Sequence, residues 1–509
     1  MSTQTPCNEV EAATDLIVVG GGGAGLAAAV AAASRGIAVV VLEAGPALGG
    51  TTLLSVGSMT AAGTRIQRAA GVSDSADMFL EDMRSAAGDG WDRDNPTLRC
   101  VFAAEAGQTI DWLERLGVVF AGPFPEPPNR ANRMHNAVPG PRVYIAALER
   151  AATRAGARIL VDAPVRHLQT DDRGDVVGVV FEEGGKPVRL LARRGVVLAT
   201  GDFSGNQPMR DRFLQDVARI ARPVNAASTG DGHELASRAG AVLLNMDAAV
   251  GPQLRFQRGT AAGLPERLPT WRWLGRMGAV AIGKAPAWML RPIIRSLLVA
   301  HMSPSPRLFQ EGAVLIDRAG NRLDETEAAA AVARADGSSA FIILDDRLAR
   351  LFSKHPYFIS TAPSISHAFL GDYEKARPEL VRRGPTVAAL ARELGISAAV
   401  LEASVRSLSD GPFVALGPVH GVLTVTDGSV RIDERCRVLR DDGSAVDGLY
   451  AVGTVGLGGM LMKGHGTRIS WAMTSGRIAG ETVARRVPAA RVALREPGHP
   501  PVARSGHGA

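Results

Sequence analysis

The chain of 509 residues is longer than a single hydrophobic core usually supports, so we expect two domains. Its composition, 46% hydrophobic and 21% charged, excludes an intrinsically disordered protein. Much of the net charge of +6 comes from a short tail, residues 485–509, with five arginines against one glutamate; such a tail is typical of a solvated end, and we expect no nucleic-acid binding.

The three cysteines, Cys7, Cys100 and Cys436, lie far apart and form no CxxC pair. This spacing predicts neither a disulfide framework nor a zinc site, and it favours a reducing cytoplasm. The first 15 residues are polar and acidic and have no basic or apolar region of the kind found in signal peptides. We therefore expect a cytoplasmic location and no bound metal.

The first predicted elements form a βαβ unit of about 30 residues. Residues 15–19 (DLIVV) are a short apolar strand, and the sequence GGGGAG follows at once. An alanine-rich helix then runs to Arg35, Gly36 ends it, and residues 37–43 (IAVVVLE) form a second buried strand.

Later segments predict further strands and helices. Residues 158–162 and 176–181 are expected as strands of a smaller sheet, and residues 194–200 as another buried strand. Further strands are expected at 313–316 and 341–344, and helices near 97–116, 142–155, 231–240 and 386–407.

Residues 267–310 differ from the rest because they contain seven Lys or Arg and no Asp or Glu, together with Trp271, Trp273 and Trp288. Prolines at 286 and 292 interrupt the segment, so no apolar run reaches the roughly 18 residues of a transmembrane helix. Three interpretations stay open. The segment is a lid that lines an apolar pocket, or it contacts a membrane surface through residues 271–302, or it binds a partner protein.

The βαβ unit carries a Gly20-x-Gly22-x-x-Gly25 motif, with Glu43 at the end of the second strand. Gly20 permits a tight turn, Gly22 lets the backbone approach a pyrophosphate, and Gly25 allows close packing of helix and strand. The helix N-terminus offers free N–H groups to phosphates, and Glu43 can accept hydrogen bonds from a ribose. This pattern predicts a dinucleotide-binding site.

Further glycine-bearing motifs follow at residues 49–52 (GGTT), 199–202 (ATGD), 448–453 (GLYAVG) and 464–466 (GHG). Over about residues 15–485, this set resembles the fumarate reductase and succinate dehydrogenase flavoprotein superfamily, which includes 3-ketosteroid dehydrogenases. The resemblance implies an α/β fold in which a Rossmann-like FAD-binding domain is split in sequence. It would comprise residues 1–251 and 424–509, with 15–485 ordered, and an inserted α+β capping domain of residues 252–423.

The resemblance also implies which residues contact FAD. They are Gly20, Gly22, Ala24, Gly25, Glu43, Ala44, Gly50, Thr51, Thr52, Ala199, Thr200, Gly201, Gly453, Thr454, Arg468 and Ile469. Arg468 is interpreted as a cation facing the flavin pyrimidine. Membrane-bound relatives tether FAD to a histidine near the GG motif, and no histidine occurs between Glu43 and Gly90. We therefore expect non-covalent FAD.

The chain departs from fumarate reductases where Phe309 stands in place of the proton-donating arginine, and at the dicarboxylate-binding positions, where residues 424–426 and Lys463 stand. Residues 464–474 are closer to 3-ketosteroid dehydrogenases, in which the matching Gly466 would polarise a ketone. The neighbouring tyrosine of those enzymes falls on Met462.

Four residues are candidates for catalysis: Lys463, His465, Gly466 and Tyr357. The alternatives are that Lys463 meets a phosphate or carboxylate, that His465 packs on the flavin and that Tyr357 has a packing role. Three others are interpreted either as the family's arginine-rich loop near the flavin or as surface residues: Arg130, Arg133 and His135.

From this resemblance we expect an FAD-dependent dehydrogenase, or reductase in reverse, that acts on a C–C bond next to a carbonyl in a bulky apolar, steroid-like ketone. Two alternatives stay open. One is a reductase of a small unsaturated carboxylic acid that uses Lys463 as its carboxylate anchor. The other is a flavoprotein without independent catalysis. The expected partner is a small apolar substrate, and the electron acceptor is unknown.

Overall fold

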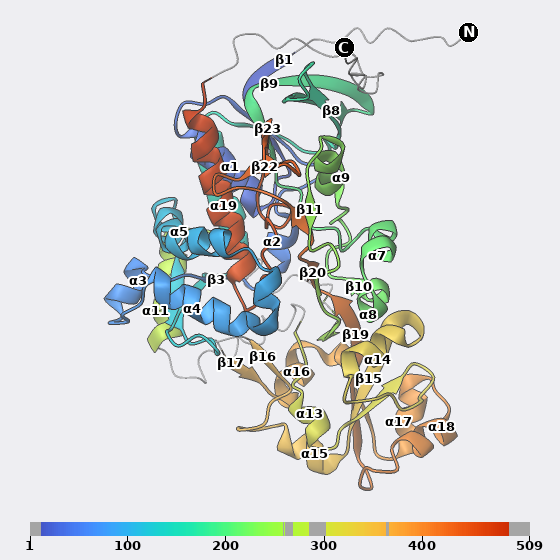
Figure 1. Ribbon diagram of the computed structural model, residues 1–509. Coiled ribbons are helices and arrows are strands. Elements are labelled where there is room, and N and C mark those ends of the chain that lie inside the picture. The colour runs from blue at the N-terminus through green and yellow to red at the C-terminus, as the bar shows by residue number, and fades with distance from the viewer. Residues whose placement is uncertain (1–11, 258, 260–267, 285–301, 363–365, 488–509) are drawn as a thin grey trace, which may run out of the picture.

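Parallel strands from both ends of the chain build the larger sheet of the protein (Figure 1). The computed structural model describes residues 12–257, 259, 268–284, 302–362 and 366–487. The strand order is β22-β23-β9-β1-β2-β6, with β8 beside β9 and β7 beside β8. The strands are β1 (Ala12–Val19), β2 (Val39–Leu42), β6 (Arg158–Leu160), β7 (Val165–Thr170), β8 (Val176–Glu183), β9 (Lys186–Leu198), β22 (Arg437–Leu439) and β23 (Ala445–Ala451).

The expectation that residues 158–162 and 176–181 belong to a smaller sheet is wrong. Strand β6 pairs in parallel with β2, and strand β8 pairs with β9, so both extend the larger sheet. Strand β6 follows helix α6 (Arg142–Arg154) in a crossover that places it next to β2. Short apolar runs show that a strand exists but do not identify its partner.

Helices cover this sheet, and two of them pack unusually closely. Helix α1 (Gly23–Ala33) is buried along its whole length and lies against the final helix α19 (Thr467–Arg485). A side chain at Gly476 or Gly480 would overlap the backbone of α1 at Ala24 or Ala28. The neighbouring helices are α2 (Gly50–Leu54), α3 (Arg65–Ala69), α4 (Ala76–Ala87), α5 (Pro96–Arg115), α7 (Gln207–Phe213), α8 (Asp216–Ile220) and α9 (Asp231–Arg238).

A second, mainly antiparallel sheet is formed by residues from the middle of the chain. Its path is β10-β19-β15-β14, and β13 and β18 also pair with β19. The strands are β10 (Arg222–Pro223), β13 (Gln253–Phe256), β14 (Val314–Asp317), β15 (Ser339–Leu344), β18 (Val381–Gly384) and β19 (Phe413–Leu423). The accompanying helices are α13 (Arg307–Gln310), α14 (Ala328–Arg334), α15 (Asp346–Leu351), α16 (Leu370–Ala376), α17 (Val387–Leu394) and α18 (Ala398–Ser404).

The helix expected near 386–407 is two helices, α17 and α18. Gly395 stands between them with φ of +70°, a left-handed conformation that ends α17. The helices expected near 97–116, 142–155 and 231–240 are confirmed as α5, α6 and α9. The apolar periodicity continues across the break, which is why the sequence predicts one helix.

Small sheets complete the fold. Strands β3 (Ser58–Thr60), β4 (Phe120–Phe124) and β5 (Met134–Ala137) form one, in the order β3-β5-β4. Two antiparallel pairs, β11 (Leu243–Leu244) with β21 (Ser429–Val430) and β12 (Ala249–Val250) with β20 (Val425–Thr426), join the chain leaving the first sheet to the chain returning to it. A further pair is β16 (Ser360–Ala362) with β17 (Ser366–Ala368).

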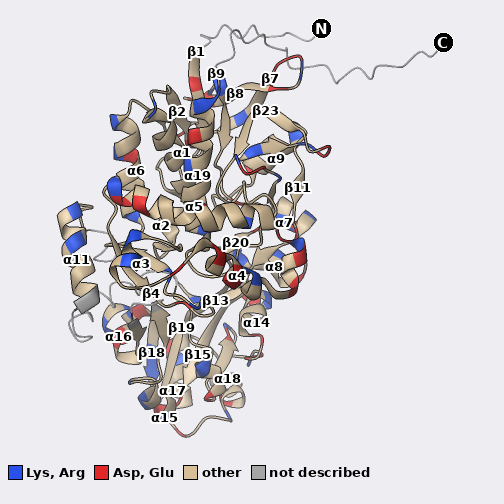
Figure 2. Cartoon of the chain, turned by 60° about the vertical axis from the view of Figure 1, so that its left-hand side comes forward, with Lys and Arg blue, Asp and Glu red and all other residues tan. Residues whose placement is uncertain are grey.

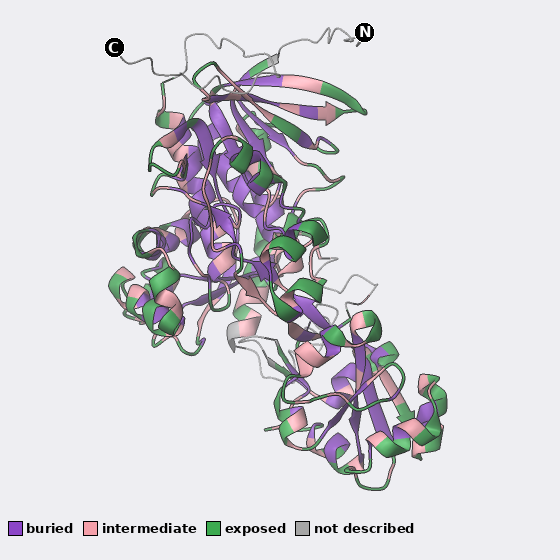
Figure 3. Cartoon of the chain, turned by 45° about the vertical axis from the view of Figure 1, so that its right-hand side comes forward, coloured by how far each residue is buried: buried purple, intermediate pink, exposed green. Residues whose placement is uncertain are grey.

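The buried residues gather in separate regions of the molecule (Figure 3). One hydrophobic cluster surrounds the larger sheet and takes its residues from positions 16–236 and 430–483. Others surround the second sheet, with residues from 254–419. Each sheet therefore has a hydrophobic core of its own.

Helix α11 (Arg272–Lys284) comes after strand β13 in the chain. Residues 285–301 of the tryptophan-bearing segment, which include Trp288, lie outside the described residues, as does most of the basic tail. Within the described ranges, no helix combines the length and apolar character that crossing a bilayer requires.

Candidate functional site

Four neighbouring strands of the larger sheet end at one edge. Register pairs Val19 of β1 with Leu42 of β2 on one side and with Leu198 of β9 on the other. Leu198 is also paired with Ala451 of β23. The motifs that follow these strands, at residues 20–25, 43–52, 199–202 and 453–454, therefore meet at this edge. Ligands of open α/β sheets bind at the carboxyl ends of the strands.

The turn after β1 depends on glycine. Gly20 has φ of +108°, and a Cβ there would lie 2.5 Å from the carbonyl oxygen of Ala199. A Cβ on Gly25 would overlap the carbonyl oxygen of Gly20. Gly22 precedes α1 and is open, because a Cβ would find only Gly49 O at 3.9 Å. The turn thus brings bare backbone to the edge of the sheet.

Glu43 accepts two backbone hydrogen bonds at the end of β2. Gly21 N donates to Oε2 at 2.7 Å, and Gly45 N donates to Oε1 at 2.8 Å. Ala44 beside it is exposed. In the GGTT motif, Gly50 begins α2 and the hydroxyl of Thr52 accepts a hydrogen bond from Gly23 N at 3.3 Å.

The chain after β9 carries a buried carboxyl group, Asp202. Thr426 N donates to its Oδ2 at 2.8 Å, which ties this edge to strand β20. Burial raises the pKa of Asp202, and its hydrogen bonds oppose that shift. Nearby, the amide of Asn225 donates to the hydroxyls of Thr51 at 2.8 Å and Ser228 at 3.0 Å. Thr51 is thereby held at the same edge.

The fourth motif reaches the edge through Gly453, which has φ of +67° and donates its N–H to Ser475 Oγ at 2.9 Å. A Cβ on Gly453 would lie 2.9 Å from the Cβ of Ala24 in α1. The turn after β23, which continues into Thr454, thus lies against the first turn of α1.

This edge fits a dinucleotide. The N-terminus of α1 has no side-chain cap and no acidic residue in its first turn, and the same holds for α19. Both helix ends can bind negative charge. Polar atoms nearby are buried without a hydrogen-bond partner, namely the hydroxyls of Thr200 and Ser470 and Nε of Arg468. Such groups are the ones that a bound ligand satisfies.

The Gly464–Gly466 turn at the start of α19 is fastened from the other side by Glu126 and Thr60. His465 N donates to Oε1 of Glu126 at 2.5 Å, and the Thr60 hydroxyl donates to His465 O at 2.6 Å. Gly466 has φ of +73°, and a Cβ there would lie 2.9 Å from Thr60 N. Burial raises the pKa of Glu126 to about 7, although hydrogen bonds from His465 and Thr60 act against that shift.

The cations of this turn are engaged by other protein groups. Lys463 Nζ donates to the carbonyl oxygen of Ala87 at 2.9 Å, near the C-terminus of α4. Arg468 pairs with the buried carboxylate of Asp427 at 2.7 Å. Loss of surrounding water and the positive charge of Arg255, on β13, both lower the pKa of His465.

Comparison with known proteins identifies the fold and its cofactor. The model of the FAD binding domain family matches residues 15–270 and 278–465. The chain belongs to this family. It is an FAD-dependent oxidoreductase that acts on CH–CH groups, and FAD is its cofactor.

Its relatives include different enzymes. The protein is 27% identical to the fumarate reductase (cytochrome) of Shewanella frigidimarina, over 92% of this chain and 77% of that one. It is 26% identical to the 4-oxocyclohexanecarboxylate 2-dehydrogenase of Sinomonas cyclohexanicum, over 92% of both chains. It is also 26% identical to the 3-oxosteroid 1-dehydrogenase of Mycolicibacterium smegmatis, over 69% of this chain and 63% of that one.

Solved structures show the same fold. The open conformation of a flavocytochrome c3 fumarate reductase superposes with a TM-score of 0.71 at 24% identity, covering 94% of this chain and 79% of the other. The 3-ketosteroid-Δ4-(5α)-dehydrogenase of Rhodococcus jostii RHA1 gives 0.61 at 23% identity, covering 94% and 98%.

Tyr357 and the arginines and histidine of residues 130–135 contact other side chains of the protein. Tyr357 packs on Phe352, with ring centroids 5.6 Å apart, and the Arg307 guanidinium lies 5.2 Å from its ring centroid. Arg133 is fully buried and paired with Asp74 and Asp82, so a surface role for it is wrong.

His135 is also buried, with Nε2 2.9 Å from the Thr64 hydroxyl, and burial lowers its pKa to about 4. Arg130 is half exposed and pairs with Glu81 and Asp82. Through these contacts, the three residues fasten the 130–135 segment to neighbouring parts of the protein.

Glu126 was not predicted as a site residue. It stands between prolines in the segment PFPEPP (residues 123–128), where nothing in the spacing links it to residue 465. Asp202 ends the ATGD motif that follows β9, so its position at the edge of the sheet could be predicted from the sequence.

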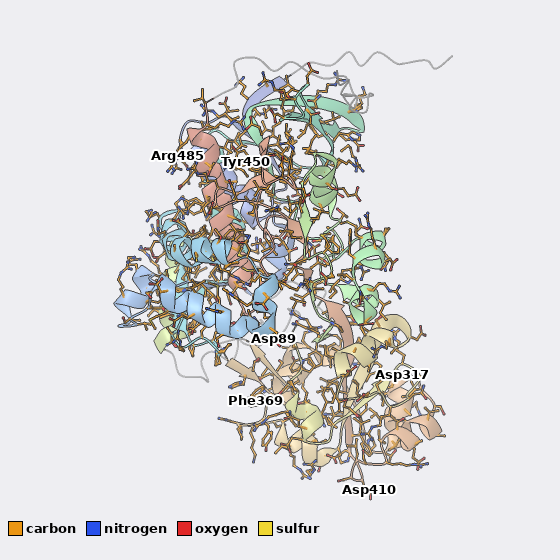
Figure 4. All side chains as sticks on the ribbon, viewed as in Figure 1. Asp89, Asp317, Phe369, Asp410, Tyr450 and Arg485 are labelled. Carbon is orange, nitrogen blue, oxygen red and sulfur yellow. The ribbon has the colours of Figure 1, made fainter. Side chains whose placement is uncertain are left out.

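A separate cavity of about 810 Å³ lies near the C-terminal half of α19. Tyr450 and Arg485, labelled in Figure 4, line it with Cys100 and Glu481. The Gly464–Gly466 turn does not line this cavity, so the cavity is distinct from the edge described above.

Proposed function

We propose that this oxidoreductase introduces, or in reverse reduces, a C–C double bond next to the carbonyl group of a bulky, largely apolar ketone. Steroid-like ketones are the first candidates. Two of the relatives, 3-oxosteroid 1-dehydrogenase and 4-oxocyclohexanecarboxylate 2-dehydrogenase, are named as dehydrogenases of oxo compounds. A cytoplasmic location remains a prediction.

The state of the charges at the Gly464–Gly466 turn carries this proposal. Lys463 and Arg468 already bind protein oxygen atoms, and the buried carboxyl group of Glu126 lies against the same turn. A dicarboxylate needs several positive donors to offset the loss of its water, and a carboxylate neighbour would repel it. An uncharged ketone needs no positive donors and is not repelled by a carboxylate.

We propose that residues 1–251 and 424–509 form the FAD-binding domain and that residues 252–423 form a cap over it. The separate hydrophobic clusters of the two sheets support this division. FAD, bound without a covalent link, would supply the hydride acceptor. We assign Gly20, Gly22, Ala24 and Gly25 to its pyrophosphate, Glu43 and Ala44 to its ribose, and the residues 50–52, 199–201, 453–454 and 468–469 to its remaining contacts.

The chain's own residues then position the ketone and move a proton. We propose that the N–H of Gly466, at the positive end of α19, polarises the ketone oxygen. Glu126 exchanges the proton next to the carbonyl, since a carboxyl group with a pKa of about 7 can both accept and donate near neutrality. His465 shapes the turn. Lys463 anchors it to α4, and Tyr357 packs in the cap.

Anaerobic titration of the purified, flavin-loaded enzyme tests the proposal. A 3-ketosteroid should bleach the absorbance of the oxidised flavin, and succinate should leave it unchanged. The Lys463→Met variant should respond to the ketone as the wild type does, because the lysine binds Ala87 rather than substrate. Bleaching by succinate, without bleaching by any ketone tested, would disprove the proposed substrate class.

A second function, reduction of a small unsaturated carboxylic acid, is favoured by one observation. Arg255 lies close enough to His465 for its charge to lower the histidine pKa, and it donates a hydrogen bond to Gln253 Oε1 at 2.8 Å, which a single carboxylate would have to replace. Dithionite-reduced enzyme should then be reoxidised by 2-enoic acids. Arg255→Gln should abolish that reoxidation, whereas Lys463→Met should not.

A further inference from the structure

Two glycines of helix α11, Gly275 and Gly278, lie closely against the protein. A Cβ on Gly275 would lie 3.1 Å from the carbonyl oxygen of Val138 and 3.2 Å from the Cβ of Val119. A Cβ on Gly278 would lie 2.8 Å from Val138 Cγ1. The inner face of the helix therefore has no room for larger residues, and it rests directly on the chain beside β4 and β5.

Four large apolar side chains in and just before this helix are exposed. Trp271, Trp273, Met277 and Val280 are 59%, 56%, 62% and 59% exposed. Residues 273, 277 and 280 follow the spacing of a single helical face. The rings of Trp271 and Trp273 stack with centroids 5.8 Å apart.

This concentration is unusual within the molecule. The other strongly exposed large apolar residues of the described chain are single valines or isoleucines, Val56, Val161, Ile220 and Val487. Scattered apolar residues are normal on a protein surface, but a contiguous group with two tryptophans marks a contact surface.

The charges around this face are positive. Arg272 and Arg276 are exposed on the same helix, and with the two tryptophans they line a shallow hollow of about 570 Å³. The surrounding sequence, residues 267–310, has seven basic and no acidic residues. Figure 2 shows α11 at the side of the molecule, with basic residues along it.

We propose that Trp271, Trp273, Met277 and Val280, with Arg272 and Arg276, dock the protein on the surface of an anionic lipid bilayer. Tryptophan rings favour the interface between headgroups and acyl chains, where neighbouring arginines meet lipid phosphates. The guanidinium groups of Arg272 and Arg276, which line the hollow with the two indoles, can donate hydrogen bonds to such a phosphate. The helix would lie on the membrane and not cross it.

The position of α11 links this surface to the candidate site. Helix α11 contacts β4, and the loop that follows β4 carries Glu126, which accepts the hydrogen bond from His465 N. An apolar substrate collected from the bilayer would thus enter close to the turn. The docking itself does not depend on which substrate the enzyme uses.

Co-sedimentation of the flavin-loaded enzyme with vesicles tests the docking. Wild-type protein should bind vesicles of phosphatidylglycerol mixed with phosphatidylcholine, and added salt should weaken this binding. Substitution of Trp271→Ser and Trp273→Ser together should lower the binding constant by about tenfold or more, equivalent to ~1.4 kcal/mol. The control Ile220→Ser, on α8, should bind as the wild type does, and retained flavin absorbance shows that each variant is folded.

Three results would overturn the inference. Wild-type protein could bind neutral and anionic vesicles equally poorly, or the double variant could bind anionic vesicles as tightly as the wild type. Light scattering could instead show a dimer that the tryptophan substitutions dissociate, in which case a second copy of the chain covers this face. Substitution of both Arg272→Gln and Arg276→Gln should remove most of the salt dependence, and an unchanged salt dependence would argue against lipid phosphates as the partner.

Discussion

Replacing Glu126 by glutamine removes a buried carboxyl group whose pKa burial raises from 4.5 to about 7. The folded protein therefore holds this proton more tightly than the unfolded chain does. The carboxyl group contributes full stability below pH 4.5 and loses that contribution as the pH rises through 7. The two pKa values differ enough to make this change about 3 kcal/mol.

Glutamine keeps the shape of the side chain and can still accept the hydrogen bond from His465 N, but it does not titrate. The Glu126→Gln variant should equal the wild type in stability at low pH and exceed it above pH 7 by up to about 3 kcal/mol. Urea unfolding of the flavin-loaded proteins, followed by flavin fluorescence across this pH range, measures the difference. The exposed Glu149→Gln serves as the matched control and should run parallel to the wild type.

This reasoning would be refuted if the free energies of unfolding of the wild type and Glu126→Gln changed in parallel from pH 4.5 to well above 7. Activity provides an independent measurement. If Glu126 exchanges the substrate proton, the variant should lose the ionisation near pH 7 from the pH profile of kcat/KM together with most of kcat. If Glu126 only positions the turn, the variant should have a changed kcat but should still exchange the proton next to the ketone carbonyl with solvent.

Three further results are expected. Gly480→Ala should lower the thermal midpoint because it overpacks the contact between α1 and α19 by about 1–3 kcal/mol, whereas Gly371→Ala, with open space around it, should not; equal midpoints would contradict the packing argument. Arg133→Met should cost about 3–5 kcal/mol by leaving the buried Asp74 carboxylate without a cation, against about 1 kcal/mol or less for Arg238→Met, which breaks an exposed pair with Glu234, as measured by urea unfolding. Acid precipitation should release all of the flavin into the supernatant, and yellow pellets would disprove non-covalent binding.

Local patterns predicted much of the fold. The alternation of apolar runs with glycine turns placed β1, α1 and β2 within a few residues of their observed ends. Capping and apolar spacing did the same for α5, α6 and α9. Strand partners were less accessible, since β6 and β8 were expected in a separate sheet. Pairing depends on which segments the crossover helices bring together, and that information is spread over the whole chain.

The candidate site divides in the same way. The glycines at 20, 25, 453 and 466 could be recognised because positive φ and close backbone approach leave a mark on the sequence itself. Glu126 leaves no such mark. Its importance comes from burial and from its hydrogen bond to a residue 339 positions away, and neither has a local signature.

The sequence by itself determined the dinucleotide-binding motif and the cofactor, because a pyrophosphate needs bare backbone and a helix terminus close together in the chain. Only the tertiary structure decided the state of the charges around the final helix. In the sequence, Lys463 looks available to the substrate and Arg468 to the flavin, yet both face oxygen atoms of distant segments. The physical reason is that the availability of a charge depends on its neighbours in space, and these were fixed when the two ends of the chain folded into one sheet.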